Sequence, residues 1–507
     1  MCRRASACRR SSGGWESASP AISNETPPWT AGSPATTEPG RRGARRKPAV
    51  NAAEAAIVHA DRTARAFALT SALWFALATS FGMLAAGYLI APDFLANVEY
   101  IHFGRVRPMH VNAVLFGFVT PGLLAAAFYF VPRLLRTPLF SESLGVFSAC
   151  FWNAALAAGL AGVSLGYSQG REYAELPWAA DLLIIAAFGL VIANLLLTVR
   201  RRTEPVLYVS IWYAAAAVVL TACTYALGNV VWKPDTGALK GIPDAILLWF
   251  YGHNVFGLLL SPLALGVAYY VLPIATRSPL YSHTLSLLGF WSLIVVYTHI
   301  GTHHLLQTPV PTWLKTISIV DSVAMVIPVM VFLINIWYTV KGKLGEIHAD
   351  IGAKFVFTGT IYYFFVNIQG SMMALPDVQR ITHYNNWVVG HAHIGVLGFA
   401  GVTALGGLYF ILPRITGRPL FSRFLADLQY WLVLIGITGF AVVLTVVGLI
   451  QGQAWYNGET LYRTLPEIQP YYVLRLSLGL LILAGAYLGL YNVLRSLYFP
   501  RGGARCA

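Results

Sequence analysis

Six histidines inside long apolar stretches are the residues of this 507-residue chain whose type and position best suit chemistry. A ring nitrogen in hydrocarbon is costly unless it is paired, faces a polar cavity or binds a metal. Four separate apolar stretches carry these imidazoles at a similar depth, so we expect them to converge. Neutral imidazoles that converge suit haem iron and copper. The six residues are His110, His253, His303, His304, His391 and His393.

The most specific local pattern is His391-Ala392-His393. On a helix, residues two apart point about 200° from each other, so one helix can offer an imidazole to each of two metal centres. A single zinc site would favour a spacing of three or four residues. Paired with His110 across a bundle, His393 would give a six-coordinate haem that transfers electrons, and His391 would give a five-coordinate haem. The alternative for this motif is a hydrogen-bonded pair in the core.

A second pattern is the adjacent pair His303-His304 near the predicted end of a helix, where fraying allows both rings to turn toward one metal. With His253 this pair would form a three-imidazole set that suits copper and leaves a position open for a ligand. Arg105 and Arg107 precede His110 and could pair with haem propionates.

Tyr297 lies seven residues before His304, so we expect it on the same helix face, two turns deeper. A phenol there can supply a proton and an electron when an O–O bond breaks; a hydrogen-bonded core tyrosine is the alternative. Four further polar residues in the inner parts of apolar stretches could line a proton path, with ordinary interhelical hydrogen bonds as the alternative. They are Ser286, Asn335, Tyr363 and Tyr269.

The composition places these residues in a membrane protein. Hydrophobic residues make up 57% of the chain and charged residues only 11%, against about 25% in a soluble chain. The net charge of +14 resides mostly in the N-terminal segment and in loops. No basic stripe is interleaved with aromatic residues, so we expect no nucleic-acid partner. The five cysteines form no Cys-x-x-Cys pair, which excludes a c-type haem in this chain.

Twelve apolar stretches are long enough to cross a bilayer as helices. Their approximate limits are 66–90, 109–132, 143–166, 178–200, 205–229, 243–273, 283–306, 317–341, 351–375, 387–413, 425–450 and 470–497. The sequence therefore predicts an all-α membrane domain over residues 66–498, with a short tail at 499–507. Residues 1–65 are rich in Ser, Gly, Pro and Arg and are predicted to be disordered. We expect translation to begin nearer Val50, which the intact mass of the mature chain would test.

The loops between these stretches alternate in charge. One set carries Arg133, Arg200–Arg202, Arg277 and Lys341, whereas the other carries more carboxylates. The positive-inside rule then predicts that both termini are cytoplasmic, in a bacterial inner membrane. This orientation places all six histidines toward the outer face, although nothing in the assignment of spans required that agreement.

These motifs resemble the catalytic subunit of the haem–copper oxygen reductases, in particular the C family, the cbb3-type cytochrome c oxidases. The resemblance extends from about Arg65 to Arg495. Its motifs are FGRVRPMHVNAVLF (103–116), PDAILLWFYGHN (243–254), Tyr297 with GTHHL (301–305), HYNNWVVGHAHIGVLGF (383–399) and QPYYVLR (469–475).

The resemblance implies a role for each matching residue. His110 and His393 would ligate low-spin haem b, His391 would ligate high-spin haem b3, and His253, His303 and His304 would hold copper. Tyr297 would be the redox-active tyrosine, which in this family is cross-linked to the histidine at the position of His253. Arg475 resembles a propionate contact, and Ser286, Asn335, Tyr363 and Tyr269 match a single K-type proton channel. The family reduces O2 to water with electrons from cytochrome c, delivered through partner subunits that bear c-type haem.

The chain departs from the family pattern at three positions. Gln369 stands where a glutamate is usual, Gly289 where a histidine is common and Asn386 where an aspartate is common. These changes bear on proton delivery and haem potential. His299 is an additional imidazole to which we assign no role.

Two rival functions stay open from the sequence. A nitric oxide reductase shares the six histidines, with non-haem iron in place of copper, but those enzymes lack the tyrosine at the position of Tyr297 and place glutamates near the metal. A proton-coupled membrane transporter would require intramembrane acid–base pairs and a repeat of two halves. The spans hold few carboxylates, and we see no such repeat.

Overall fold

The computed structural model describes residues 61–230 and 240–499. In these residues it has twelve helical segments long and apolar enough to cross a membrane, and no named strand, as the sequence predicts. The predicted disordered tail (residues 1–60 of it), the start near Val50 and most of the tail at 499–507 lie outside the described residues.

The first six spans contain α2 to α9, several of which join end to end. Their elements are α2 (Arg62–Ile90), α3 (Phe103–Asn112), η2 (Ala113–Val119), α4 (Thr120–Leu134), α5 (Glu142–Ser164), α6 (Trp178–Arg200), α7 (Val209–Tyr225), η3 (Ala226–Val230), α8 (Ile242–Asn254), η4 (Val255–Leu260) and α9 (Ser261–Thr276). The short η1 (Glu99–Ile101) precedes the second span.

The last six spans contain α10 to α19. Their elements are α10 (His283–Tyr297), η5 (Ile300–Leu305), α11 (Thr312–Ala324), α12 (Val326–Thr339), α14 (Ile351–Met373), α16 (Asn386–His393), η6 (Ile394–Gly401), α17 (Val402–Thr416), α18 (Arg423–Tyr456) and α19 (Leu461–Tyr498). The short helices α13 (Leu344–Ala349) and α15 (Pro376–Thr382) lie between spans.

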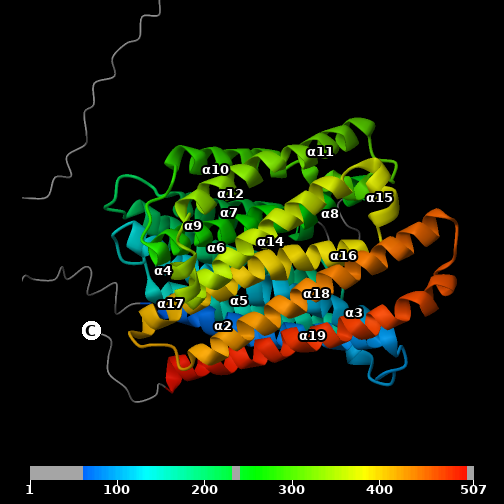
Figure 1. Cartoon of the computed structure of the whole chain (residues 1–507), viewed down its shortest axis with the longest axis horizontal. Coiled ribbons are helices and arrows are strands. Elements are labelled where there is room, and N and C mark those ends of the chain that lie inside the picture. The colour runs from blue at the N-terminus through cyan, green and yellow to red at the C-terminus, as the bar shows by residue number, and fades with distance from the viewer. Residues whose placement is uncertain (1–60, 231–239, 500–507) are drawn as a thin grey trace, which may run out of the picture. The chain divides into compact units, whose positions relative to one another are not determined.

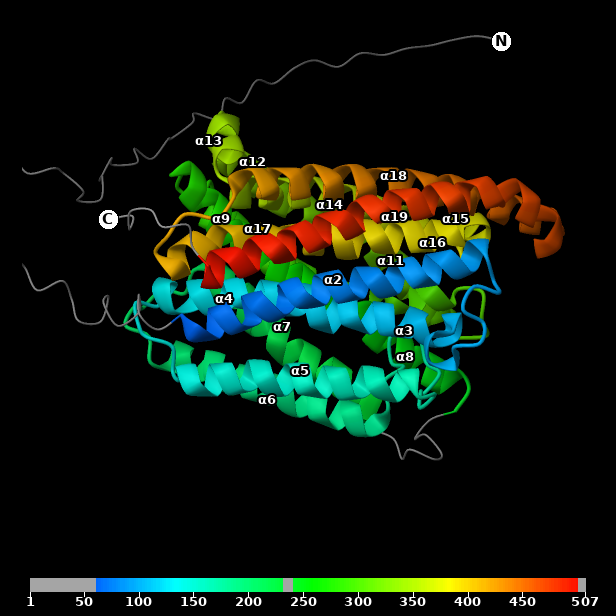
Figure 2. The same ribbon diagram turned by 90° about the horizontal axis from the view of Figure 1, so that it is seen from below.

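The predicted limits are wrong by the largest margin at the last span, which begins at Leu461 and not at residue 470. Hydropathy marks only the part of a helix that lies in hydrocarbon, and α18 and α19 continue beyond that part through polar residues. A 34-residue helix is about 50 Å long, against a hydrocarbon core of about 30 Å. Figures 1 and 2 show α18 and α19 side by side, projecting beyond the ends at which α3, α8 and α16 begin. At the other end of the chain, residues 62–65 are helical, which shortens the predicted tail.

Three spans form the centre of the bundle. In the spans that contain α3, α8 and α16, between 89% and 94% of the apolar window is buried inside the protein, against 22–61% in the other nine. These three spans carry His110, His253 and the His391–His393 pair near their N-terminal ends. The bundle therefore places the histidines in its interior.

A threefold repeat, which the sequence analysis did not identify, organises this bundle. Ser141, Ser282 and Ser422 each cap the helix that follows a central span, and each accepts a hydrogen bond from the backbone N–H three residues later. A buried asparagine on a following span clamps the serine backbone in each case, at 2.8–3.1 Å. The asparagines are Asn194, Asn335 and Asn492.

The repeat extends to the histidines. His110, Tyr251 and His391 stand the same number of residues before their capping serines, and so do Asn112, His253 and His393. A π-helical stretch follows these positions in all three spans: η2, η4 and η6. Such wide turns occur frequently at functional sites. These two sets of three equivalent positions thus include four of the six histidines: His110, His253, His391 and His393.

Candidate metal centres

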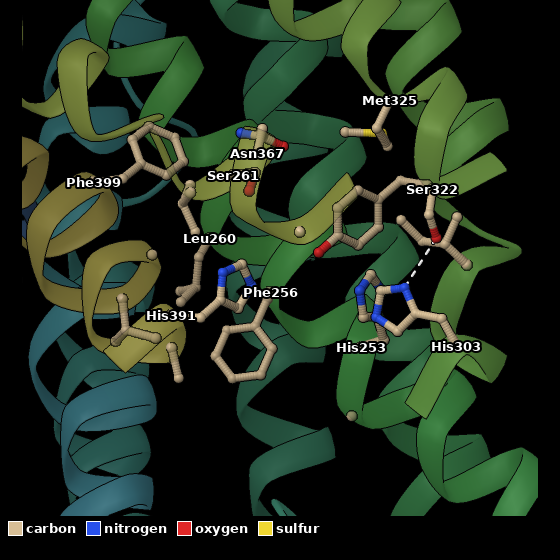
Figure 3. Close-up of a pocket in the computed structure, with 18 of the residues that line it drawn as sticks. His253, Phe256, Leu260, Ser261, His303, Ser322, Met325, Asn367, His391 and Phe399 are labelled. Atoms are coloured by element: carbon tan, nitrogen blue, oxygen red, sulfur yellow. Dashed lines mark hydrogen bonds between the residues drawn. The ribbon is translucent and has the colours of Figure 1, made fainter. Parts of the chain in front are cut away.

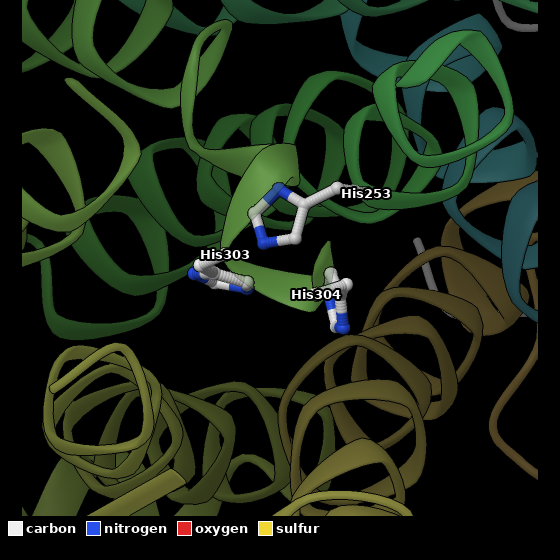
Figure 4. Close-up of side chains that lie close together, drawn as sticks. All are labelled: His253, His303 and His304. Atoms are coloured by element: carbon white, nitrogen blue, oxygen red, sulfur yellow. The ribbon is translucent and has the colours of Figure 1, made fainter. Parts of the chain in front are cut away.

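The first candidate centre is a cluster of three imidazoles. His253 comes from α8, and His303 and His304 come from η5; one ring nitrogen of each lies within 4.8 Å of the other two. Figure 4 shows the three side chains lying close together. Three neutral nitrogen donors with an open position suit copper.

The hydrogen bonds around this cluster leave nitrogen atoms free for a metal. The hydroxyl of Ser322 donates to the Ser318 carbonyl at 2.5 Å, so its oxygen accepts a bond from Nδ1 of His303 at 2.9 Å. Nε2 of His303 is then unprotonated. Nδ1 of His253 is buried without a hydrogen-bond partner among the described residues. A buried nitrogen without a hydrogen-bond partner is a suitable metal ligand.

Neither Ser322 nor Trp249 was among the predicted site residues. The Trp249 ring stacks on His304 with centroids 3.9 Å apart and an interplanar angle of 14°. Ser322 lies on α11, far from the histidines in sequence, and no motif marks it. Partners of this type orient a metal-bound imidazole and fix its tautomer.

We expect the Ser322→Ala variant to bind copper 10–100-fold more weakly, the usual effect of removing a partner that orients a ligand. The reason is that Nδ1 of His303 loses its acceptor. Equilibrium competition with a copper chelator measures the affinity. Ser292→Ala, which removes a hydroxyl bonded only within its own helix, is the matched control. Equal affinity in both variants would contradict this role for Ser322.

Tyr297 lies beside this cluster, but not where the helical spacing predicts. It is the last residue of α10, and the chain then tightens into the 3₁₀ helix η5, so Tyr297 and His304 do not share one continuous helix. Gly301 lets η5 approach the Trp249 backbone carbonyl at this break. The phenol ring lies 4.6 Å from the His253 ring, centroid to centroid. It also packs directly on Gly257, where any side chain would collide with it.

His391 lies across a cavity from the three-imidazole cluster (Figure 3). The empty volume of this cavity is about 930 Å³, part of which is open to solvent. Nδ1 of His391 and Oε1 of Gln369 are both buried without a partner among the described residues. His391 presents an imidazole to this cavity, and this arrangement fits a haem bound to that residue.

The second candidate centre is the pair His110–His393. The two rings are nearly parallel, at 19°, with centroids 6.3 Å apart. Two metal–nitrogen bonds of about 2 Å each, plus the two ring radii, account for this separation. Nδ1 of His110 donates to the Ala78 carbonyl at 2.7 Å, and Nδ1 of His393 donates to the Val389 carbonyl at 2.8 Å. Both Nε2 atoms therefore remain available to an iron placed between the rings.

All three arginines predicted near haem propionates have a partner in the protein. Arg105 donates to the Ser164 carbonyl at 2.8 Å, and Arg107 forms an ion pair with Glu172 at 2.6 Å. Arg475 donates to the neutral amide of Asn386 at 3.3 Å and has no carboxylate partner among the described residues. Arg475 lies over the Phe440 ring, which packs on His393, and this position fits an anionic group on a haem held between His110 and His393.

The four residues of the predicted proton path lie in two places. Tyr363 lines the cavity, and its hydroxyl is buried without a partner among the described residues. Asn335 donates to the Tyr269 hydroxyl at 3.4 Å, and also to the backbone of Ser282 in the repeated clamp. Ser286 donates to the carbonyl of His283. Phe332 separates the rings of Tyr269 and Tyr363, so these residues form no continuous hydrogen-bonded chain.

His299 and Gly289 lie outside the cavity lining. The His299 ring is 3.6 Å from Asp321, and more than half of its side chain is exposed. Gly289 faces Val331 and the Tyr213 hydroxyl. Neither position contacts the six histidines.

Glu175 is a buried acid on the loop between α5 and α6, outside the spans. Its side chain is 5% exposed and accepts a hydrogen bond from Asn112 at 3.0 Å. Burial raises its pKa from 4.5 to about 7. Deprotonation is thus easier in the unfolded chain, and the stability of the fold declines as pH rises from about 4.5 to about 7.

The Glu175→Gln variant, which cannot ionise, should escape this decline. We expect its thermal midpoint to exceed that of the parent protein by more at about pH 8 than at about pH 5. Parallel thermal midpoints across this range would contradict the raised pKa. Glu346→Gln, at a carboxylate on the exposed surface, is the control.

A polytopic bundle with histidines converging on two interior centres defines a membrane-embedded oxidoreductase of the haem–copper class. Residues 62–481 match the family described as Cytochrome C and Quinol oxidase polypeptide I, and the chain belongs to this family. It is accordingly the catalytic subunit of a terminal respiratory oxidase, a family that uses haem and copper. This membership excludes the transporter.

Curated relatives and a solved structure agree with this assignment. The chain is 32% identical to a cytochrome c oxidase subunit 1 homolog of Agrobacterium tumefaciens, over 85% of this chain and 83% of the relative. It is 31% identical to the cbb3-type cytochrome c oxidase subunit CcoN1 of Stutzerimonas stutzeri, over 86% and 94%. A heme-copper terminal oxidase dimer solved by cryo-EM shares the fold, with a TM-score of 0.72 and 18% identity over 87% of this chain and 85% of that one.

Proposed function

We propose that this chain is the catalytic subunit of a cbb3-type cytochrome c oxidase, which reduces O2 to water. The observation that carries the proposal is the cavity that His391 lines on one side and the three-imidazole cluster on the other, with Tyr297 beside His253. The relative named as a cbb3-type subunit supports the subclass.

The histidines take the following roles in this proposal. His391 ligates high-spin haem b3, and His253, His303 and His304 hold copper. His110 and His393 ligate low-spin haem b between their parallel rings. When bound, the high-spin haem and the copper supply the place where O2 binds and receives electrons.

The residues of the chain supply orientation and protons. Ser322 and Trp249 hold the cluster rings so that their lone pairs face the cavity. Tyr297 holds a proton on its hydroxyl at the cavity wall, and Gly257 gives that ring its space. The cavity is otherwise lined largely by apolar and aromatic side chains, which limits bulk water around the reacting atoms.

Proton supply from the cytoplasm is assigned to Ser286, Asn335, Tyr269 and Tyr363. Tyr363 forms the end of this proton path at the cavity, because it lines the cavity and its hydroxyl is buried. Tyr269 and Asn335 form the middle, where they share a hydrogen bond. In this proposal, water molecules connect the Tyr269 and Tyr363 hydroxyls past the Phe332 ring.

A low-spin haem bound to His110 and His393 would supply the entry point for electrons. We propose that c-type cytochrome subunits of the same complex deliver them from cytochrome c, since this chain has no Cys-x-x-Cys-His motif of its own. Arg105, Arg107 and Arg475 are assigned to the propionate side of the haems, with Arg475 the best placed. The complex lies in a bacterial inner membrane with both termini of this chain cytoplasmic, and the catalytic domain begins at Arg62, the first residue of α2.

Metal analysis of the purified complex tests the proposal against a nitric oxide reductase. We expect copper and haem b, a reduced-minus-oxidised spectrum of both haems, and O2 consumption with reduced cytochrome c. Non-haem iron in place of copper, with consumption of nitric oxide and not of O2, would overturn it.

A further inference from the structure

Arg475 is a half-buried cation without an acid partner among the described residues. Three other cations of the spans are paired with acids: Arg107 with Glu172, Arg133 with Asp61 and Lys354 with Asp427, at 2.6–2.9 Å. Within the described part of the chain, Arg475 donates one side-chain hydrogen bond, to the neutral amide of Asn386 at 3.3 Å. Its Nε is buried without a partner among the described residues.

Asn386 is the first residue of α16, the helix that carries His391 and His393. Its Nδ2 donates to Oε1 of Gln451 at 2.7 Å and to the Tyr472 hydroxyl at 3.1 Å, while its Oδ1 accepts from Arg475. The backbone N–H of Asn386 donates to the same Gln451 oxygen. The network therefore uses the amide as both donor and acceptor, which a carboxylate could not do.

The guanidinium carbon of Arg475 lies 5.3 Å from the centroid of the Phe440 ring, and that ring lies 4.6 Å from the ring of His393, centroid to centroid. Arg475 is therefore beside the His110–His393 pair. Haem iron gains a positive charge on oxidation. A nearby cation that no carboxylate neutralises therefore disfavours the ferric form and favours the ferrous form. Because residue 386 is a neutral amide, it does not cancel the positive charge of Arg475 near His110 and His393.

We propose that Asn386 is a positioning residue that holds Arg475, without a protein carboxylate as its partner, beside the low-spin haem. There the cation offsets the negative charge of a haem propionate and thereby raises the reduction potential of that haem. This inference rests on the proposed function, because it requires a haem between His110 and His393. In the protein, the pair Asn386–Arg475 has a charge of +1. A carboxylate at position 386 would reduce it to zero by forming an ion pair with Arg475.

The test is a redox titration of the low-spin haem in the purified holoenzyme complex, followed by its optical absorption. In Asn386→Asp we expect the ferrous-to-ferric ratio at a fixed potential to fall about tenfold, which is 59 mV for one electron. Arg475→Gln, which also brings the charge of the pair to zero, should shift the midpoint in the same direction. The high-spin haem should shift less, because Arg475 lies over Phe440 on the His393 side, whereas His391 faces the cavity.

Two further variants separate charge from structure. Tyr472→Phe removes one hydrogen bond to the same amide without changing any charge, so its midpoint should stay at the parent value. Gln451→Glu places a negative charge one hydrogen bond farther from Arg475 and should lower the midpoint by less than Asn386→Asp does. It also serves as the test if Asn386→Asp fails to fold.

The outcomes are distinguishable. A preparation without a low-spin haem spectrum overturns the proposed function itself. A normal spectrum with an unchanged or raised midpoint in Asn386→Asp, or an unchanged midpoint in Gln451→Glu should the first variant not fold, overturns this inference alone. A shift of the same size in Tyr472→Phe would also overturn it, because the effect would then come from the hydrogen bond and not from the charge.

Discussion

Replacing His391 with alanine should abolish O2 consumption. In the proposed site this imidazole is the only histidine on its side of the cavity, so no other ring can take its place at the high-spin haem. The loss should exceed the 10–100-fold effect that follows removal of a partner that merely supports a ligand. Oxygen consumption of the complex with reduced cytochrome c measures it, and the spectrum should lose the high-spin haem but keep the low-spin haem.

The matched control is His299→Ala, because His299 is an intramembrane imidazole that contacts Asp321 and lies outside the cavity. We expect it to retain most of the activity. Added imidazole should partly restore the His391→Ala variant, since the substitution leaves room for a free ring. Normal turnover in His391→Ala with both haems retained would contradict the assignment of this residue.

Replacing Tyr297 with phenylalanine should reduce turnover by at least about 100-fold, the lower end of what a positioned proton donor contributes. Phenylalanine keeps the ring that packs on Gly257 and His253, so the metals should remain bound. Only the hydroxyl at the cavity wall is removed. The measurements are O2 consumption and, on the same sample, the copper and haem content.

Tyr362→Phe is the control for this substitution. Tyr362 is a buried tyrosine whose hydroxyl bonds to Thr438 and does not reach the cavity. Its loss should change turnover by no more than a few-fold, as expected for one ordinary hydrogen bond. Full activity in Tyr297→Phe would remove this residue from the proposed chemistry.

Much of the architecture could be predicted from the sequence, because a helix that crosses the hydrocarbon core needs about 20 consecutive, mainly apolar residues. The fourth span, predicted at 178–200, agrees with Trp178–Arg200 in the structure. The two-residue spacing of His391 and His393 predicts rings on opposite sides of one helix, and in the structure His391 lines the cavity while His393 faces His110. Both results depend only on local periodicity.

The remaining features depend on contacts between distant segments, which periodicity does not encode. Ser322 reaches His303 because α11 packs against η5, and Trp249 supports His304 through ring stacking between α8 and η5. The break after Tyr297 follows from the packing of Gly301 against α8, so a continuous helix was the wrong expectation there. The signal for the threefold repeat was present in the serines that cap three helices, but a search for two halves could not reveal it.

The repeat also has a consequence for how the subunit matures. Asn112 and Tyr251 occupy positions equivalent to those of the proposed haem ligands, and both bond to the loop before α6. Protein alone thus closes the contact between the first four spans and the next four at this point. We expect this contact to form in the newly made chain without a cofactor, whereas the contacts that contain His391 and the His110–His393 pair each require a haem.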